Sequence, residues 1–494
     1  MSVGEGLIGH WPEAVGVRGE ETHVPPPHGG WRFDVDFTLS LGVDAPLRQA
    51  PLGDLVAAYD ATSRTGLTLG FAHLGGVTSN APNERQLSCA LDAGTEPVFT
   101  DLGRPGDAAL IFSLASCRGS LFAGTSEWGE AGRGRVMRWD PLRGWQDTGI
   151  PIRCNAVTAL GVHGDQLYAG TGYYRYSGSA LQDSPNQEPG GEILRLQDDG
   201  NWMALGHLAD RKTIGGLAWL GDDLYADSLY PPAGFFRRSA SGEWLELPLP
   251  ENRRMQALMP HDGALFASSY DGGFVFRYRP DTGWEELGKV GENTQTYSFA
   301  VFGNRVHVGT WPSGRVYAWT GAGWEDTGRL DEELEVMGMI PYAGKLYAGT
   351  LPLAEVHRLD GAGWTRVGRV DFTPDVTYRR AWTSALHSGS LYWGTLPSGH
   401  VWRMDAGCCA STPTAWPGGR TRLTVVRRNN SLELYQDSTR VAVGSGDCPA
   451  ARISTPLVLG GGPQGFAGAT LDGIRLYSRA LSADEIGELC ATEQ

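Results

Sequence analysis

One unit recurs seven times along the middle of this chain, and it limits the fold more than any other feature. Each unit has an apolar stretch, a Gly/Asp turn, a Leu-Tyr-Ala-Gly-Thr-like stretch, a Gly-containing loop, a Val-x-Arg-Trp-like stretch and then usually Gly-Trp. The copies lie 40 to 57 residues apart, which is the spacing of four-stranded propeller blades. The sequence therefore predicts a seven-bladed β-propeller. Its copies are marked by the hydroxyl residues Thr125, Thr171, Ser228, Ser269, Thr310, Thr350 and Thr395.

The repeat also predicts how the ring closes. We name the strands of a unit a to d in chain order. Six units have a Trp in strand d, but the seventh copy ends at Asp405 with no Trp after it. The segment Val98–Leu102, upstream of the first unit, matches strand d with Phe99 in the place of the Trp. We predict that residues 97–405 form the propeller and that Val98–Leu102 pairs with Val401–Met404, which removes the exposed sheet edges.

Composition supports an all-β protein and excludes several functions. The 70 Gly and 29 Pro among 494 residues oppose helices, and 41% hydrophobic residues can fill a large core. A net charge of −15 argues against nucleic-acid binding, and the lack of an 18-residue apolar run argues against a membrane span. The first residues, Met1–Glu5, do not resemble a signal peptide. We expect a cytoplasmic protein, unless the N-terminus was processed, in which case it is secreted.

Cysteine usage leaves the redox environment open. The seven Cys residues include no C-x-x-C pair, so we expect no zinc site, and one or two disulfides stay undecided.

The two flanks, residues 1–96 and 406–494, do not repeat but alternate like strands. Ser482–Glu485 is a capping box that predicts a short helix ending at Cys490. Strands are predicted at Trp31–Phe37, Leu67–Phe71, Leu423–Val426, Leu432–Tyr435 and within Leu471–Leu481.

Three segments of the flanks resemble a laminin-G-like (concanavalin A-like) jelly roll. Gly6–Pro12 resembles its opening, while Leu434–Asp437 and Asp472–Leu481 resemble its later strands and its end. The chain departs from the pattern after Asp437, where a Gly often follows. The resemblance implies one β-sandwich, residues 1–96 and 406–494, interrupted by the whole propeller.

The interruption has two geometric consequences. The sandwich would replace the c–d hairpin of blade seven, so it should lie on the face of the a–b and c–d turns. Positions such as Val35 and Phe37 should pack against Leu434 or Ile474.

Candidate functional residues lie in the b–c and d–a loops, on the opposite face. Arg gathered on one face of an acidic protein suggests an anionic ligand, and aromatic rings stack on sugars. Arg forks bind carboxylates, so a glycan that contains uronic acid fits both residue types. The catalytic candidates are Tyr173, Tyr176, His207 and Tyr270, and the substrate-binding candidates are Arg175, Arg253, Arg379, Arg380, Trp128, Trp311 and Trp382.

At the level of fold and loop composition, the propeller is similar to carbohydrate-active propellers, including seven-bladed polysaccharide lyases. That resemblance implies β-elimination on a polysaccharide or oligosaccharide. An Arg would neutralise the uronate carboxylate, and Tyr or His would move the protons. No cofactor or metal ligand is predicted, and a structural calcium and the oligomeric state stay open. The alternatives are a non-catalytic glycan-binding protein and a protein-interaction propeller. These residues could also have only a structural role. The Arg residues would then form salt bridges on the surface, and Tyr173–Tyr176 would be a loop that packs over its neighbours.

Overall fold

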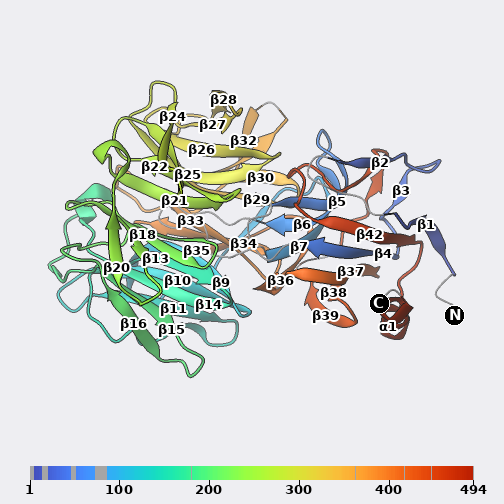
Figure 1. Ribbon diagram of the computed structural model, residues 1–494, viewed down its shortest axis with the longest axis horizontal. Helices are drawn as coiled ribbons and strands as arrows, with labels where there is room; N and C mark the ends of the chain where they lie inside the picture. Colours follow the sequence, from blue (N-terminus) through green and yellow to red (C-terminus); the bar gives the residue numbers. More distant parts are fainter. Residues whose placement is uncertain are drawn as a thin grey trace.

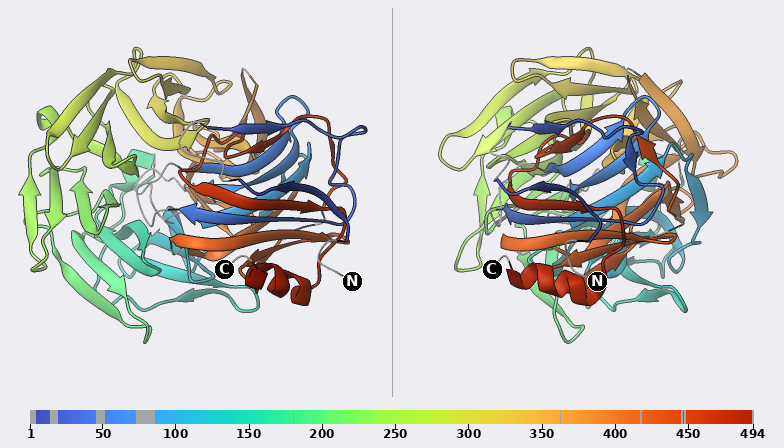
Figure 2. Two further views of the ribbon diagram at one scale, coloured as in Figure 1. Left: turned by 45° about the vertical axis from the view of Figure 1, so that its right-hand side comes forward. Right: turned by 90° about the vertical axis from the view of Figure 1, so that its right-hand side faces the viewer.

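The computed structural model describes residues 5–13, 20–45, 52–72, 86–179, 181–361, 363–416, 418–444, 446 and 448–492. Within them the protein is all-β apart from one α-helix and two short 3-10 helices. Seven four-stranded antiparallel sheets are arranged around a common centre, and two six-stranded sheets lie to one side of them (Figures 1 and 2). The arrangement of four-stranded sheets is β-propeller-like.

Each four-stranded sheet is one blade, and six blades are continuous in the chain. From the centre outward, blade one contains β9 (Ala108–Cys117), β10 (Ser120–Glu127), β11 (Gly134–Asp140) and β12 (Gly144–Asp147). Blade two contains β13 (Ala156–His163), β14 (Gln166–Gly172), β15 (Glu192–Leu196) and β16 (Trp202–His207). Blade three contains β17 (Gly216–Leu220), β18 (Asp223–Ser228), β19 (Gly234–Arg238) and β20 (Trp244–Leu247).

The remaining blades follow the same order. Blade four contains β21 (Met255–His261), β22 (Ala264–Ser269), β23 (Phe274–Arg279) and β24 (Gly283–Lys289). Blade five contains β25 (Gln295–Phe302), β26 (Arg305–Trp311), β27 (Arg315–Trp319) and β28 (Trp324–Arg329). Blade six contains β29 (Glu335–Tyr342), β30 (Lys345–Leu351), β31 (Glu355–Asp360) and β32 (Gly363–Arg369). Blade seven contains β33 (Arg380–His387), β34 (Ser390–Leu396), β35 (Val401–Asp405) and β8 (Val98–Asp101).

The Gly-Thr pair of the repeat has two structural roles. The Thr hydroxyl donates to the backbone carbonyl where strand c approaches, as from Thr350 to Glu355 (2.9 Å) and from Thr310 to Arg315 (2.8 Å). The Gly leaves room for the next blade, because a Cβ at Gly349 would lie 2.3 Å from the Ala381 carbonyl oxygen. The pair therefore fixes both the b–c loop and the packing between blades.

Strand β8 closes the ring as the repeat predicts. It pairs with β35 in antiparallel register, with Phe99 opposite Met404, and the Leu102 N–H donates to the Val401 carbonyl (2.9 Å). The Phe99 ring lies against Gly368 of blade six, and Trp364 lies in the same way against Gly328 of blade five. Phe99 thus takes the packing role of the strand-d Trp, and the predicted strand pairing is confirmed.

The flanks combine in two six-stranded sheets, each built from both ends of the chain. One sheet has the order β1 (Leu7–Trp11), β42 (Thr470–Tyr477), β4 (Phe37–Ala45), β37 (Gly419–Arg428), β38 (Ser431–Gln436), β39 (Thr439–Val443). The other has the order β2 (Thr22–Val24), β41 (Leu457–Leu459), β5 (Gly53–Asp60), β6 (Thr65–Ala72), β7 (Gln86–Ala93), β36 (Cys408–Ala415). A short pair, β3 (Trp31–Arg32) with β40 (Arg452–Ile453), and helix α1 (Ala483–Thr492) complete the flanks.

The core between these sheets agrees with part of the expected packing. Phe37, Leu434 and Ile474 belong to one cluster of buried side chains. The expectation for Val35 is wrong, since its side chain is exposed. The predicted strand Trp31–Phe37 is also interrupted, because β3 ends at Arg32 and the chain turns before β4 begins at Phe37. Asp34, which accepts hydrogen bonds from Arg32 and Arg452, is a residue type that favours such a turn.

Two local predictions at the C-terminal end can be compared directly. The capping box is confirmed, because Ser482 N–H donates to Glu485 (2.8 Å) and Glu485 N–H donates to the Ser482 hydroxyl (3.3 Å). The turn between β38 and β39 forms without a Gly, since Asp437 itself adopts a left-handed conformation with φ of 52°. Its side chain also accepts the Arg422 N–H (2.9 Å).

The six-stranded sheets contact the blades at their a–b turns. Gly119 N–H of blade one donates to the Pro413 carbonyl (3.2 Å), and Gly303 N–H of blade five donates to the Gln464 carbonyl (3.1 Å). Gly389 N–H of blade seven donates to the Ser411 hydroxyl (2.8 Å). These contacts confirm the expected face and leave the b–c and d–a loops on the opposite face.

Candidate functional site

A cavity of about 100 Å³ lies on the b–c and d–a face, where the innermost strands begin. All seven blades contribute to its lining, from Phe112 in blade one to Arg380 and Trp382 in blade seven. We call it the mouth cavity. Its polar and aromatic lining consists of Phe112, Thr158, Tyr174, Thr213, Tyr230, Gln256, Tyr270, Tyr297, Glu335, Arg380 and Trp382.

Two opposite charges are buried in the mouth cavity. Arg380 and Glu335 are 8% and 3% exposed, and each is the first residue of an innermost strand. Burial raises the pKa of Glu335 above its usual range, although the Arg380 charge and a hydrogen bond with Tyr297 oppose that rise. The carboxyl group can therefore take up or hold a proton closer to neutral pH than an ordinary Glu.

The tyrosine hydroxyls of the cavity are proton donors. Burial raises the pKa of Tyr230 and of Tyr297 well above their ordinary value, so both hydroxyls keep their protons at neutral pH. The Tyr297 hydroxyl donates to Gln295 (2.6 Å), and the Arg254 guanidinium lies over the Tyr270 ring at 4.6 Å. The raised pKa makes Tyr230 and Tyr297 weaker acids than an ordinary tyrosine, so these hydroxyls act first as hydrogen-bond donors to a ligand.

Among the polar atoms of the cavity, two on Gln256 and Trp382 lack a partner within the described residues. They are the Oε1 acceptor of Gln256 and the Nε1 donor of Trp382. Buried polar groups are nearly always hydrogen-bonded, so these atoms mark places where water or a ligand binds.

The blade-two insertion, between β14 and β15, covers one side of this cavity and contains the 3-10 helix η1 (Tyr176–Ser179). The Gly178 carbonyl accepts a hydrogen bond from Arg380 (3.2 Å). Tyr176 is fully buried, its hydroxyl lies 2.7 Å from that of Ser126, and burial raises its pKa to about 12. Tyr173 donates to Gln187 (2.7 Å), and Arg175 is an exposed partner of Asp183.

The structure brings Tyr270, Arg380 and Trp382 of the predicted residues together in the mouth cavity, and it places the others outside its lining. Arg253 lies over the Phe274 ring at 3.9 Å, and Arg379 donates to the Thr373 carbonyl (2.6 Å). Trp128 is half exposed and donates to the Gln182 carbonyl. Trp311 packs edge-on against Tyr378, and His207 is exposed beside the Gly190 carbonyl (3.0 Å).

Sequence reasoning missed Glu335, Gln256, Tyr230 and Tyr297 as members of one site. A signal for Glu335 exists in the repeat. Glu335 lies opposite Leu351 in blade six, and Arg380 lies opposite the matching Leu396 in blade seven. Aligning the repeats on their Leu-Pro pairs would have placed both charges at the same central position.

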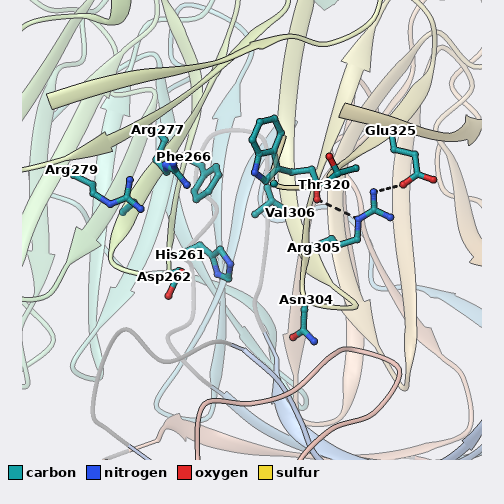
Figure 3. A pocket seen from close by; sticks show the side chains of 13 residues that line it. His261, Asp262, Phe266, Arg277, Arg279, Asn304, Arg305, Val306, Thr320 and Glu325 are labelled. Carbon is teal, nitrogen blue, oxygen red and sulfur yellow. Dashed lines mark hydrogen bonds and ion pairs between the residues drawn. The ribbon is translucent and has the colours of Figure 1, made fainter. Parts of the chain in front are cut away.

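A larger pocket of about 580 Å³ lies on the opposite face, between blades four and five (Figure 3). Its three Arg side chains already face carboxylates, with Arg279 lying 3.6 Å from Glu285. Arg277 forms a forked pair with Glu285 (2.9 and 2.7 Å), and Arg305 pairs with Glu325. An anionic ligand would have to compete with these carboxylates, so this pocket is the weaker candidate.

One group of described side chains has the spacing to hold a metal ion. Ligand atoms of Asp331, Glu355 and His357 lie within 4.8 Å of one another. His357 Nε2 lies 3.3 Å from Asp331, and Arg366 donates to Glu355 (2.8 Å). Since Arg366 already supplies positive charge to Glu355, we assign no metal to this group.

The fold and the mouth cavity define an all-β protein with a β-propeller-like fold and a polar, aromatic cavity at the centre of one face. No helix in the described ranges is long and apolar enough to cross a membrane.

Comparison with known proteins adds little beyond this fold. No protein family and no curated protein matches the chain. Virginiamycin B lyase from Staphylococcus aureus is similar over 63% of this chain and 99% of its own, at 9% identity and a TM-score of 0.47. A streptogramin B lyase is similar over 63% of this chain and 98% of its own, at 11% identity and a TM-score of 0.48. U3-55K is similar over 62% and 98%, at 13% identity and a TM-score of 0.43. We draw no function from these similarities.

Proposed function

We propose that the mouth cavity is the active site of a polysaccharide lyase that cleaves an anionic, uronic-acid-containing glycan by β-elimination. The observation that carries the proposal is a buried Arg380 in one cavity with Glu335 and the hydroxyls of Tyr230, Tyr270 and Tyr297. A cation, a proton acceptor and proton donors are the three groups that this reaction requires.

Each group has a role in the elimination. Arg380 binds the uronate carboxylate, which acidifies the proton at C5. Glu335 accepts that proton, the C4–O4 bond breaks as the C4–C5 double bond forms, and a tyrosine hydroxyl, Tyr270 in our assignment, protonates the leaving oxygen. Burial strengthens these electrostatic interactions because little water screens them.

The volume of the cavity limits what it can hold. About 100 Å³ corresponds to roughly three water molecules, so the cavity takes the carboxylate-bearing edge of one sugar ring. Neighbouring sugars would then contact the b–c loops of the same face, in which Arg175 and Trp128 are exposed. A sugar ring at Arg380 would also displace the Gly178 carbonyl of the blade-two insertion.

A non-catalytic glycan-binding protein is the second candidate. It is favoured by the half-exposed Trp128 ring in the b–c loop of blade one, which can stack on a sugar without any proton transfer. The two candidates differ in the need for Glu335 and Tyr270, since binding requires neither proton acceptor nor proton donor.

We also propose that residues 97–405 are a propeller domain inserted in a laminin-G-like sandwich formed by residues 1–96 and 406–494. The support is the composition of the two six-stranded sheets, each of which takes strands from both flanks. The flanks share one cluster of buried side chains, in which Phe37 and Leu434 lie together.

The test is a panel of uronic-acid polysaccharides assayed for the ultraviolet absorbance of the unsaturated product. We expect turnover of at least one member and a loss of about 1.5–3 kcal/mol of substrate binding in Arg380→Ala. Arg380→Lys should rescue only in part, because the fork is lost. Tyr270→Phe should lower kcat more than it changes KM.

Arg315→Ala is the matched control, since Arg315 pairs with Asp326 in blade five and does not line the cavity. Glycan binding without any product would favour the second candidate. Binding that is unchanged in Arg380→Ala would contradict the lyase proposal.

A further inference from the structure

Two cysteine thiols meet between the six-stranded sheets. Cys408 begins β36 in one sheet, and Cys448 lies in the segment that follows β39, the edge strand of the other. Their sulfur atoms are 2.9 Å apart although the residues are 40 positions apart in the chain. This separation is shorter than an ordinary non-bonded contact between two sulfurs. Both residues belong to the same buried core cluster.

The backbone around both thiols holds them in place. Cys408 lies opposite Leu91 of β7, within the sheet. The Cys448 N–H donates to the Asn430 carbonyl (3.1 Å), and the Cys448 carbonyl accepts from Arg427 (3.2 Å). A Cβ at Gly444 would come within 2.6 Å of the Cys408 sulfur, so the chain encloses the pair closely. Only a small displacement separates this contact from a bond.

We propose that Cys408 and Cys448 form a disulfide that joins the two six-stranded sheets, and that it forms while the chain folds in the presence of a small-molecule or protein disulfide. One thiolate attacks the donor disulfide and releases a donor thiol, and the second thiolate displaces the other donor sulfur. The Cys408–Cys448 bond forms, the donor S–S bond is reduced to two thiols, and the two cysteine protons pass to them.

Burial decides when this reaction can take place. Cys408 and Cys448 are 0% and 4% exposed, and the contact with Cys448 together with burial raises the pKa of the Cys408 thiol. The thiolate is the reactive form, and it must reach the other sulfur. In the folded chain, therefore, the thiols are not oxidised and the disulfide is not reduced. The redox state of the pair is therefore set by the redox conditions under which the protein folded. A bonded pair indicates that the protein folded in an oxidising compartment.

The experiment is to refold the full chain in a mixture of oxidised and reduced glutathione, denature it, alkylate it and measure its intact mass. We expect five of the seven cysteines to be alkylated, and all seven after reduction. Peptide mapping should link the peptides that contain Cys408 and Cys448. Alkylation of all seven without reduction would overturn the proposal.

Adjacent and nearby thiols supply the matched controls. Cys408→Ser or Cys448→Ser should leave every remaining cysteine alkylated, whereas Cys409→Ser and Cys89→Ser should keep the linked pair. A link that persists in Cys408→Ser would assign the bond to another thiol and contradict the proposal. If a Ser variant fails to fold, the peptide map of the wild-type chain decides by itself.

A second measurement tests the role of burial. The folded, oxidised protein is incubated with a phosphine reductant, with and without denaturant, and alkylated at intervals. The link should persist in the folded chain and disappear in the denatured one. Equally rapid reduction in both conditions would contradict the burial argument.

Discussion

A buried ion pair connects blade six to the flanking sheets and permits a quantitative test of that interface. The side chains of Lys345, the first residue of β30, and of Asp92, near the end of β7, are 2% and 1% exposed. Lys345 also donates to the Ala343 carbonyl (3.2 Å), and Thr95 N–H donates to Asp92 (2.9 Å). Burial lowers the pKa of Lys345 despite its partner, which indicates how strongly the site disfavours a single charge.

The perturbations are Lys345→Met and Asp92→Leu, each alone and both combined. Lys345→Met leaves a buried carboxylate without its cation, and such a loss costs about 3–5 kcal/mol of the free energy of unfolding. The double variant removes both charges, and its cost should fall to about 1 kcal/mol, from the Thr95 N–H that loses its acceptor. The two residues should therefore show a strong coupling energy in a double-mutant cycle.

Urea unfolding followed by tryptophan fluorescence measures these free energies in the full chain. Lys289→Met is the matched control, because Lys289 pairs with Glu292, whose side chain is 98% exposed. That variant should cost less than about 1 kcal/mol. The reasoning is refuted if Lys345→Met costs no more than Lys289→Met, or if the double variant is as destabilised as the sum of its parts.

Two further predictions concern single buried groups. Burial raises the pKa of Glu333 to about 7 from its ordinary 4.5, so the folded chain holds a proton that the unfolded chain releases, and stability falls by up to roughly 3 kcal/mol as pH rises between these values. Glu333→Gln keeps an acceptor for Leu353 N–H and should remove this slope in urea titrations below and above that range. Tyr176→Phe removes the hydroxyl beside Ser126, should cost about 1 kcal/mol of unfolding free energy and should retain product formation, unlike Tyr270→Phe. A loss of turnover in correctly folded Tyr176→Phe would return this residue to the catalytic group.

The repeat makes the fold predictable because each of its constant residues makes a local contact that the blade requires. The Gly of the Gly-Thr pair makes room for the next blade, as at Gly349, and the Thr hydroxyl fixes the start of strand c, as at Thr350. Ring closure follows from Phe99, whose packing on Gly368 repeats that of a strand-d Trp. Such contacts lie within one blade or between neighbouring blades. The repeat in a single sequence is therefore enough to predict the propeller.

The site is less predictable because it depends on contacts across the ring. Glu335 ends an acidic stretch that begins at Asp331 and looks like a solvated loop, yet it is the first residue of an innermost strand and is buried. Tyr176 has the residue type of a catalytic group, but its hydroxyl reaches from the blade-two insertion to Ser126 in β10 of blade one. The same limit applies to Val35, which a turn exposes within an alternating sequence. Residue type and loop position indicate a face of the propeller, but not which side chains turn inward.

The constant positions of the repeat build the propeller, whereas the side chains of the mouth cavity occupy variable positions. Gly349 and Thr350 of blade six match Gly394 and Thr395 of blade seven, and both Thr hydroxyls donate to the chain that enters strand c. At the first position of the innermost strand the same two blades differ, with Glu335 in one and Arg380 in the other. A residue at that position is held by the ladder hydrogen bonds of its blade, which do not depend on its side chain. The six-stranded sheets occupy a–b turns on the other face. Variation is therefore tolerated where the mouth cavity forms, and a charge pair can arise there without a change to the contacts that build the ring.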